Sequence, residues 1–339
     1  MLHGRSIHGD NRQSFLNLCE LDLISKTFYA EGMVWLKYAD LPTWLDHWDR
    51  EIIEAPVRAL RFVNNVDRHD LSLELEPVLP VQDADGLNIQ WLKFSGRFVA
   101  NDLNLRMFPF ETLHLSIEVE LEDLYASETN LTYEPSGSLL ATGGDLSGYR
   151  IIRTAVTQAV HSYSTNWGWK LAVSCNGAEN LAEFDNIRTE LVYQRSTRSS
   201  LLNIFLPLAV MMCVVLTVPL IDIQQHENRV VIPASVLLVL VFLQEGYKKI
   251  LPAGLNYPTL ADLIYSSCFI STIGIFLWSV ASANLFLESA TANQPAISDL
   301  NQQGSVIVAI NVIFLLSTNN LLWLRSRREQ SRAKGCMTL

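Results

Sequence analysis

The chain has 339 residues, of which 49% are hydrophobic and 18% charged, with a net charge of −10 and a mean hydropathy of +0.17. The length suits two domains, and the acidic balance argues against nucleic-acid binding, which needs a basic surface. The charge is uneven. Residues 1–200 hold 17 Lys and Arg against 28 Asp and Glu, and the remainder holds 8 against 7. An acidic first half therefore precedes a nearly neutral, apolar second half.

The first half is predicted to be an all-β sandwich of the immunoglobulin-like kind. Short strand patterns alternate with turn signals such as "QDADG" and "PSG", with one helix expected at 44–53. The expected strands are 27–38, 71–79, 87–98, 113–121, 151–161 and 186–194, with a further strand around Cys19.

The stretch "NDLNLRMFPFETLHL", residues 101–115, stands out in this half. Its tip, Phe108-Pro109-Phe110, is apolar and is followed at once by Glu111. After it, apolar residues alternate with polar ones from Leu113 to Leu121, which predicts a half-buried strand. A solvated turn would favour polar residues at this tip, so the pattern indicates that the loop packs against something apolar.

The second half is predicted to cross a membrane four times, which divides the chain into domains at 1–198 and 199–339. Each helix has an apolar run of the length that a bilayer requires. The expected helices are 201–221, 229–250, 260–287 and 306–324.

The second of these helices is the most polar, and helical spacing gathers most of its polar groups on one stripe. Two interpretations of these polar groups stay open. Either the last turn of the helix lies at headgroup depth, or the helix lines an aqueous path that has an apolar constriction. The stripe consists of Glu227, Val231, Ser235, Leu238, Phe242, Glu245 and Lys249.

Five cysteines are present, and none forms a CxxC motif, so neither a disulfide framework nor a zinc site is indicated. A bridge between Cys19 and Cys175 stays open. The first residues, "MLHGRSIHGDNRQSF", contain no apolar run of a secretory signal. Either an upstream segment has been removed or the first domain stays inside the cell.

The chain resembles the bacterial pentameric ligand-gated ion channels over nearly its whole length. "FSGRFVANDLNLRMFPFETLHLSIEVELE" is similar to their strand, aromatic-Pro-aromatic-acid loop and strand, and "VRALRFVNN" to the approach to a binding loop. "SLLNIFLPLAV" and "ILPAGLNYPTLAD" resemble the start of the first membrane helix and the link between the second and third. Asn101 and Leu115 stand where animal members have their bridging cysteines.

The resemblance implies a homopentamer in the bacterial inner membrane, with four identical subunits around each chain and a periplasmic β-domain. Permeating cations, membrane lipid and an unknown small agonist are the implied partners, with no cofactor. Five Glu227 carboxylates at the inner mouth favour cation selectivity, and rings of Leu238 and Phe242 would form the gate. Arg229 is expected to pair with a neighbouring carboxylate.

The resemblance also assigns the residues that couple the two domains. Asp22, Glu111 and Arg195 are expected to form a charge cluster, with Pro109 and Pro252 in the loops that meet there. The alternative is three solvated charges that contribute little.

For the agonist, the family implies an aromatic box between subunits. The candidates are Tyr38, Phe62, Glu120, Glu122, Tyr125, Trp167, Trp169 and Phe184. Modulation by Ca²⁺ or protons stays open. The acidic turns that hold Asp67, Asp70, Asp83 and Asp85 offer carboxylates to a divalent cation, or are solvated turns.

The tail 325–335 holds five basic residues, whereas the loop before the fourth helix holds none. The positive-inside rule therefore favours the opposite orientation from that of the family. This leaves an alternative function, a membrane-anchored sensor with a cytoplasmic β-domain and no pore. No nucleophile–base pair or metal-ligand spacing indicates an enzyme.

Overall fold

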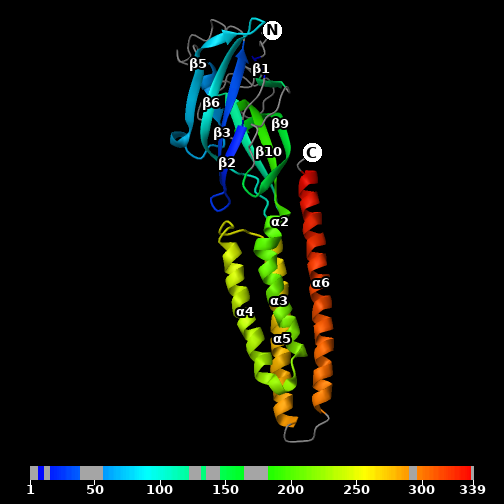
Figure 1. The fold of residues 1–339 in the computed structure, drawn as a ribbon. Helices are drawn as coiled ribbons and strands as arrows, with labels where there is room; N and C mark the ends of the chain where they lie inside the picture. The colour runs from blue at the N-terminus through cyan, green and yellow to red at the C-terminus, as the bar shows by residue number, and fades with distance from the viewer. Residues whose placement is uncertain are drawn as a thin grey trace. The chain divides into compact units, whose positions relative to one another are not determined.

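The computed structural model describes residues 7–10, 16–38, 56–121, 131–134, 146–163, 182–289 and 296–336 (Figure 1). The helix expected at 44–53 lies outside these residues. The chain forms two compact units. The first comprises Met1–Leu103 and Leu113–Gln194, and the second comprises Asn104–Thr112 and Arg195–Leu339. The second unit thus includes the segment around Phe108-Pro109-Phe110, called here the Phe-Pro-Phe loop (Asn104–Thr112).

The first unit is a sandwich of two antiparallel four-stranded sheets, which confirms the predicted fold class. One sheet has the order β2-β3-β6-β5 and the other the order β4-β7-β10-β9, while β1 and β8 form a separate parallel pair. The bounds are β1 Ile7–Asp10, β2 Leu16–Asp22, β3 Thr27–Tyr38, β4 Leu60–Phe62, β5 Ser72–Gln82, β6 Asn88–Val99, β7 Thr112–Leu121, β8 Leu131–Glu134, β9 Tyr149–Tyr163 and β10 Ala182–Arg195.

Period-two patterns locate the long strands well. β3 has the predicted bounds and pairs with β6 along its whole length, from Thr27 opposite Val99 to Tyr38 opposite Asn88. β4 has three residues and was not predicted, because three residues are too few to show alternation. β8, with four residues, was missed for the same reason.

Phenylalanine rings fill the space between the two sheets. Phe62 of β4 contacts Phe94 and Phe98 of β6, with ring centroids 4.7 and 5.8 Å apart. Phe28 of β3 stacks on Phe98 at 5.7 Å. All four rings are buried, so this cluster joins the two inner faces as the alternation predicts.

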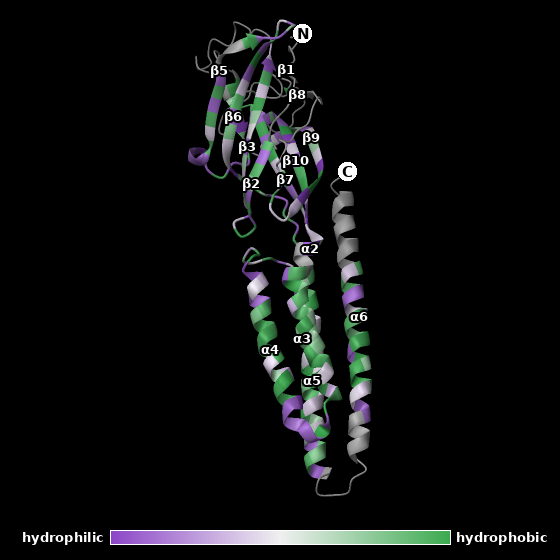
Figure 2. Ribbon diagram, viewed as in Figure 1, coloured by the Kyte–Doolittle hydropathy of each residue, from purple (hydrophilic) through white to green (hydrophobic). Residues whose placement is uncertain are grey.

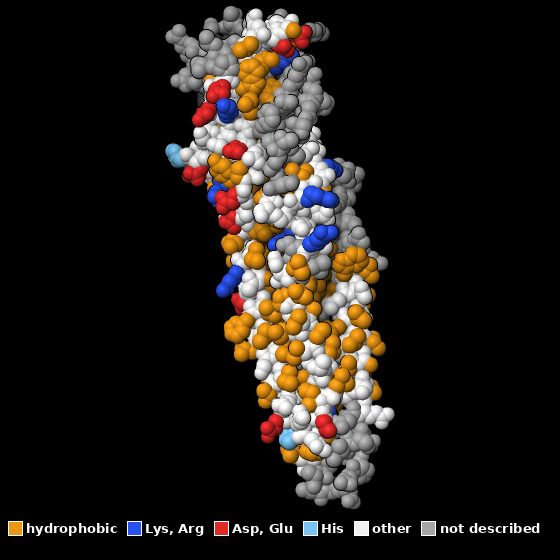
Figure 3. All heavy atoms as spheres, in the orientation of Figure 1, with side chains coloured by type: hydrophobic (Ala, Val, Ile, Leu, Met, Phe, Trp, Pro, Cys, Tyr) orange, Lys and Arg blue, Asp and Glu red, His pale blue; other side chains and the backbone are white. Residues whose placement is uncertain are grey.

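The described residues of the second unit form four apolar helical spans, which confirms a multi-pass membrane protein. They are Leu202–Leu220, Ile223–Lys248, Leu260–Glu288 and Gln302–Leu324. Figure 2 shows the hydrophobic residues concentrated along these helices, and Figure 3 shows the apolar side chains that they present on one face. The helical elements are α2 Thr197–Ser200, the π-helical turn η4 Leu201–Phe205, α3 Leu206–Thr217, η5 Val218–Leu220, η6 Ile223–Gln225, α4 His226–Lys248, α5 Leu260–Ser289 and α6 Ala296–Cys336.

The last helix differs most from its prediction, because α6 continues well beyond its apolar span at both ends. Hydrogen bonds from Ser267 to Asn319 (3.0 Å) and from Ser271 to Asn311 (2.9 Å) tie it to α5. Since residue numbers rise on α5 as they fall on α6, the two helices are antiparallel. The C-terminal end of α6 therefore lies at the end of the unit where α5 begins.

Arg229 stabilises the connection from α3 to α4. Its guanidinium is fully buried, lies over the ring of Trp278 at 5.3 Å, and donates to the carbonyls of Ile221 and Pro219. Carbonyls at a helix C-terminus lack intrahelical donors, and a cation satisfies them well. Backbone oxygens of Ile221 and Pro219 thus accept from Arg229, and the nearby Asp222 carboxylate adds its charge.

Candidate functional site

The Phe-Pro-Phe loop packs against the helices of its own unit. Phe108 is fully buried and stacks on Tyr247 of α4, with ring centroids 6.2 Å apart. Phe110 lies parallel to Phe205 at 5.7 Å. The apolar tip therefore has the apolar neighbours that its composition requires.

The loop also caps the N-terminus of α5. The first backbone N–H groups of a helix have no intrahelical acceptor. Here Leu260 donates to the carbonyl of Arg106 at 2.8 Å, and Ala261 donates to the carbonyl of Phe108 at 3.1 Å. The loop carbonyls thus supply acceptors that α5 itself lacks.

A capping box completes this helix start. The Asp262 amide donates to the Thr259 hydroxyl at 3.2 Å, and the Thr259 amide donates back to the Asp262 carboxylate at 2.9 Å. The second carboxylate oxygen of Asp262 accepts a hydrogen bond from the hydroxyl of Tyr247 at 2.6 Å. Tyr247 therefore links the end of α4 to the start of α5 while its ring contacts Phe108.

Two of the three predicted coupling charges form an ion pair. The Arg195 guanidinium donates to the fully buried Glu111 carboxylate at 3.0 Å and lies 5.1 Å from the Phe108 ring centroid. The Arg195 amide also donates to the Glu111 carbonyl at 3.2 Å. Charge-assisted hydrogen bonds are stronger than neutral ones, and removing one partner of a buried pair is costly because it leaves a charge without compensation.

The third coupling charge, Asp22, belongs to the first unit and stabilises its own turn. Its carboxylate accepts from the Ser25 hydroxyl at 2.7 Å and from the Ile24 amide at 2.9 Å. The hydrogen bond from Ser25, aided by the backbone amides, lowers the pKa of Asp22 below its usual value. Pro252 is buried in the segment between α4 and α5.

Two tyrosines of this site were not predicted. Tyr257 accepts the Leu105 amide at 3.1 Å, and the Arg106 guanidinium lies 4.9 Å from its ring centroid. Tyr247 sits in the apolar pattern of α4, where a sequence gives it no reason to differ from a core residue. The Leu-Asn-Tyr-Pro-Thr segment before α5 did offer a signal, because Thr259 and Asp262 have the spacing of a capping box.

The predicted stripe of α4 is exposed along its whole length in the single chain. The exposed fraction is 60% for Leu238 and 66% for Phe242, and the other members of the stripe are exposed as well. The opposite face is buried, with Val236 and Leu240 among its residues. Among the described residues, the other helices of the unit thus leave this polar-and-apolar stripe uncovered.

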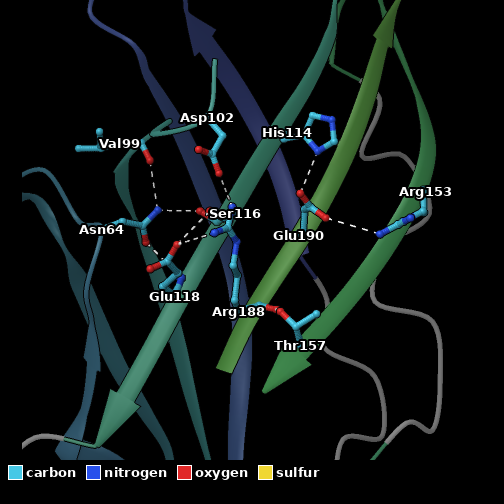
Figure 4. Close-up of polar contacts among 10 residues, drawn as sticks. All are labelled: Asn64, Val99, Asp102, His114, Ser116, Glu118, Arg153, Thr157, Arg188 and Glu190. Atoms are coloured by element: carbon cyan, nitrogen blue, oxygen red, sulfur yellow. Dashed lines mark hydrogen bonds and ion pairs between the residues drawn. The ribbon is translucent and has the colours of Figure 1, made fainter. Parts of the chain in front are cut away.

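In the first unit, β7, β10 and β9 carry a charged network on one face (Figure 4). Arg188 binds Asp102 at 2.6 Å and lies 3.6 Å from Glu118. Burial opposes the charge of Arg188, but its hydrogen bond to Asp102 and the nearby carboxylates outweigh burial and raise its pKa. The carboxylate of neighbouring Glu190 lies 2.8 Å from Nδ1 of His114 and 3.8 Å from the guanidinium of Arg153. These contacts brace neighbouring strands.

Some of the predicted agonist residues are buried in the single chain. Phe62 is part of the phenylalanine cluster, and Tyr38 is buried and donates to Gln90 at 3.1 Å. Glu120 and Phe184 come together around Tyr163, which donates to Glu120 at 2.8 Å and meets the Phe184 ring edge-on at 5.7 Å. Four candidates lie outside the described residues: Glu122, Tyr125, Trp167 and Trp169.

His161 completes this small group. Its ring lies 4.4 Å from that of Tyr163, and its Nδ1 is 3.6 Å from the buried carboxylate of Glu120. The group therefore combines an acid, a base and two aromatic rings on β7, β9 and β10. Glu120 and Phe184 are buried, so the contacts of this group link the three strands to one another.

The acidic turns have partners of their own. In the first turn, the Asp67 carboxylate accepts a hydrogen bond from the His69 amide at 2.9 Å, and the Asp67 carbonyl accepts one from the Asp70 amide. In the second turn, the Lys37 ammonium binds Asp83 at 2.7 Å and lies 3.8 Å from Asp85. Within the described ranges, no three His, Cys, Asp or Glu residues are grouped to hold a metal ion. The thiols of Cys19, Cys213 and Cys268 are free, and Cys175 lies outside the described residues.

Comparison with known proteins gives no match, either to a family model or to a curated protein sequence.

Replacing Glu120 by Gln should lower the pKa of Tyr163. Burial, followed by the hydrogen bond and charge of Glu120, raises this pKa to about 12, from an ordinary value of about 10. Glu120→Gln removes the charge and keeps the burial, so the phenol should ionise at lower pH. The difference between the absorbance titrations of Glu120→Gln and Glu120→Gln/Tyr163→Phe isolates this group.

The same pKa has a consequence for stability. Folding raises the pKa of Tyr163, so the neutral phenol contributes to the stability of the folded state. This contribution is present below about pH 10 and is lost as pH rises through about 12. Wild type should therefore lose stability over this range more steeply than Tyr163→Phe. Equal slopes, or an unchanged Tyr163 titration in Glu120→Gln, would contradict the assigned hydrogen bond.

Proposed function

We propose that this chain is one subunit of a homopentameric ligand-gated ion channel of the bacterial type, and that α4 of each subunit lines a cation-selective pore. The β-domain would receive the agonist between subunits. The support comes from the β-sandwich followed by four apolar spans, together with the sequence resemblance of the Phe-Pro-Phe loop and the helices.

The exposed stripe of α4 carries this proposal. In a bilayer, an uncovered stripe would place Glu227 and Glu245 against lipid, which is costly for charged groups. By contrast, the span of α6, residues 302–324, contains no charged residue and exposes Ile313 and Leu316, as suits a helix facing lipid. Neighbouring copies that bring their α4 stripes around water would remove the cost at α4.

The order of groups along the stripe is the basis for the proposed ion selectivity and pore closure. Glu227, at one end, would form a ring of carboxylates that attracts cations and repels anions. Leu238 and Phe242 would form apolar rings that close the path by dewetting. Glu245 and Lys249 would stand at the other mouth.

Gating would pass through the Phe-Pro-Phe loop. The chain runs from β6 through this loop into β7, and the loop caps α5 and contacts Tyr247 of α4. A movement of either strand would therefore reach the pore helix through buried contacts. The Glu111–Arg195 pair ties the loop to the end of β10, which leads into α2 and α3.

Reversing the charge of Glu227 tests the pore assignment. In planar bilayers with a potassium chloride gradient, wild-type protein should give a reversal potential close to that of K⁺. Glu227→Lys should move it towards that of Cl⁻, because five positive charges would replace five negative ones. Glu288→Lys is the matched control: Glu288 is an exposed carboxylate at the same end of the unit but on α5, and its replacement should leave the reversal potential unchanged. Protein that does not conduct, or equal reversal potentials for wild type and Glu227→Lys, would refute the assignment.

One observation favours the sensor with a cytoplasmic β-domain. Seven of the eight basic residues in 201–339 lie at the end of the unit where α5 begins, which the positive-inside rule would place in the cytoplasm. A variant whose single cysteine is Cys336 separates the two orientations. The channel predicts that a membrane-impermeant maleimide labels this thiol in intact spheroplasts. Labelling only after lysis would favour the sensor.

A further inference from the structure

The start of α4 is fixed to α5 by two side chains. The ring centroid of His226 lies 5.7 Å from that of Phe286, and the Arg229 guanidinium lies 5.3 Å from the Trp278 ring centroid. His226 and Arg229 are three residues apart, so they lie on the same face of the helix. This face of the first turn of α4 therefore packs against α5.

Glu227 lies on the other side of the same turn. At about 100° per residue, its side chain leaves the helix roughly 200° from that of Arg229. Arg229 is fully buried, whereas Glu227 is exposed, as is Asp222 just before α4. The inward position of Arg229 thus keeps the Glu227 carboxylate on the exposed stripe.

Arg229 does not stand at a favourable place in its own helix. It is the fourth residue of α4, close to the positive end of the helix dipole, and burial of a charge is costly unless partners compensate it. The partners lie at the end of η5, where the guanidinium donates to the carbonyl of Ile221 at 2.7 Å and to that of Pro219 at 3.3 Å. Arg229 therefore stabilises the attachment of α4 to its neighbours rather than α4 itself.

The Pro219 carbonyl is also in contact with α6. Gly304 of α6 is buried, and a Cβ atom at this position would overlap with the Pro219 carbonyl oxygen. Glycine, which has no Cβ, therefore allows this close approach of the two backbones. An acceptor of Arg229 is thus held by α6 as well, so that α4, α5, α6 and η5 all meet around one guanidinium.

We propose that Trp278 is a positioning residue for ion selectivity. Its ring and the two carbonyls hold Arg229 inside the unit, and this holds Glu227 on the side of α4 that faces the pore. Five carboxylates at fixed positions would then attract cations at the mouth. The inference rests on the proposed function, because it requires that α4 lines the pore.

Trp278→Leu tests the inference, since it removes the ring and leaves every charge in place. In planar bilayers with a potassium chloride gradient, the reversal potential gives the K⁺/Cl⁻ permeability ratio. This ratio should fall at least about fivefold, which corresponds to about 1 kcal/mol, because Glu227 would lose its fixed position. Trp278→Phe keeps an aromatic face for the guanidinium and should largely keep the ratio. Trp323→Leu, the matched control, removes an exposed tryptophan of α6 and should equal wild type.

Arg229→Gln separates position from charge. If Arg229 acted only through its field, removing a positive charge near the mouth would raise the K⁺/Cl⁻ permeability ratio. Loss of the anchor should instead lower it, and this direction decides the matter if Trp278→Leu is not recovered as folded protein. Equal ratios in wild type and Trp278→Leu, or a ratio in Arg229→Gln that rises or stays the same, would overturn the inference and leave the proposed function in place. Wild-type protein that does not conduct would overturn both.

Discussion

The helical unit depends on acceptors that α5 does not supply for itself. The amides of Leu260 and Ala261 donate to carbonyls of the Phe-Pro-Phe loop, and Phe108 fills the space beside Tyr247. A buried N–H group without an acceptor costs free energy comparable to a lost hydrogen bond. The loop is therefore part of the membrane unit by packing, although its sequence lies between two strands. This explains why an aromatic-Pro-aromatic tip is favoured where a solvated turn would be polar.

Sequence patterns predicted the long strands, the four spans and the stripe of α4, because each has a period that a window of residues can show. The pair between Glu111 and Arg195 followed from the family resemblance. Tyr247 could not be found this way, since its role arises from the meeting of α4, α5 and the loop. Arg229 was predicted to lie near a carboxylate, and Asp222 does add its charge there. Its hydrogen bonds to the carbonyls of Ile221 and Pro219 could not be predicted, because no residue pattern reveals them.

The faces of the membrane helices divide by chemistry. α6 exposes aliphatic side chains along its span, whereas α4 exposes a stripe with charges at its ends. The two ends of the unit differ as well, one basic and one acidic. The proposed subunit would turn α4 towards its copies and water and α6 towards lipid.

The central claim is that the loop, together with the start of α5 that it caps, acts on the pore helix through Tyr247, and single-channel recording of Tyr247→Phe tests the bond from Tyr247 to α5 most directly. The variant keeps the ring against Phe108 and loses only the hydroxyl that donates to Asp262. Recordings in potassium chloride should show the unitary conductance of wild type, because Tyr247 lies on the buried face of α4, with a changed open probability. Tyr265→Phe, which alters the neighbouring ring, should match wild type. An open probability equal to that of wild type in Tyr247→Phe would contradict the account.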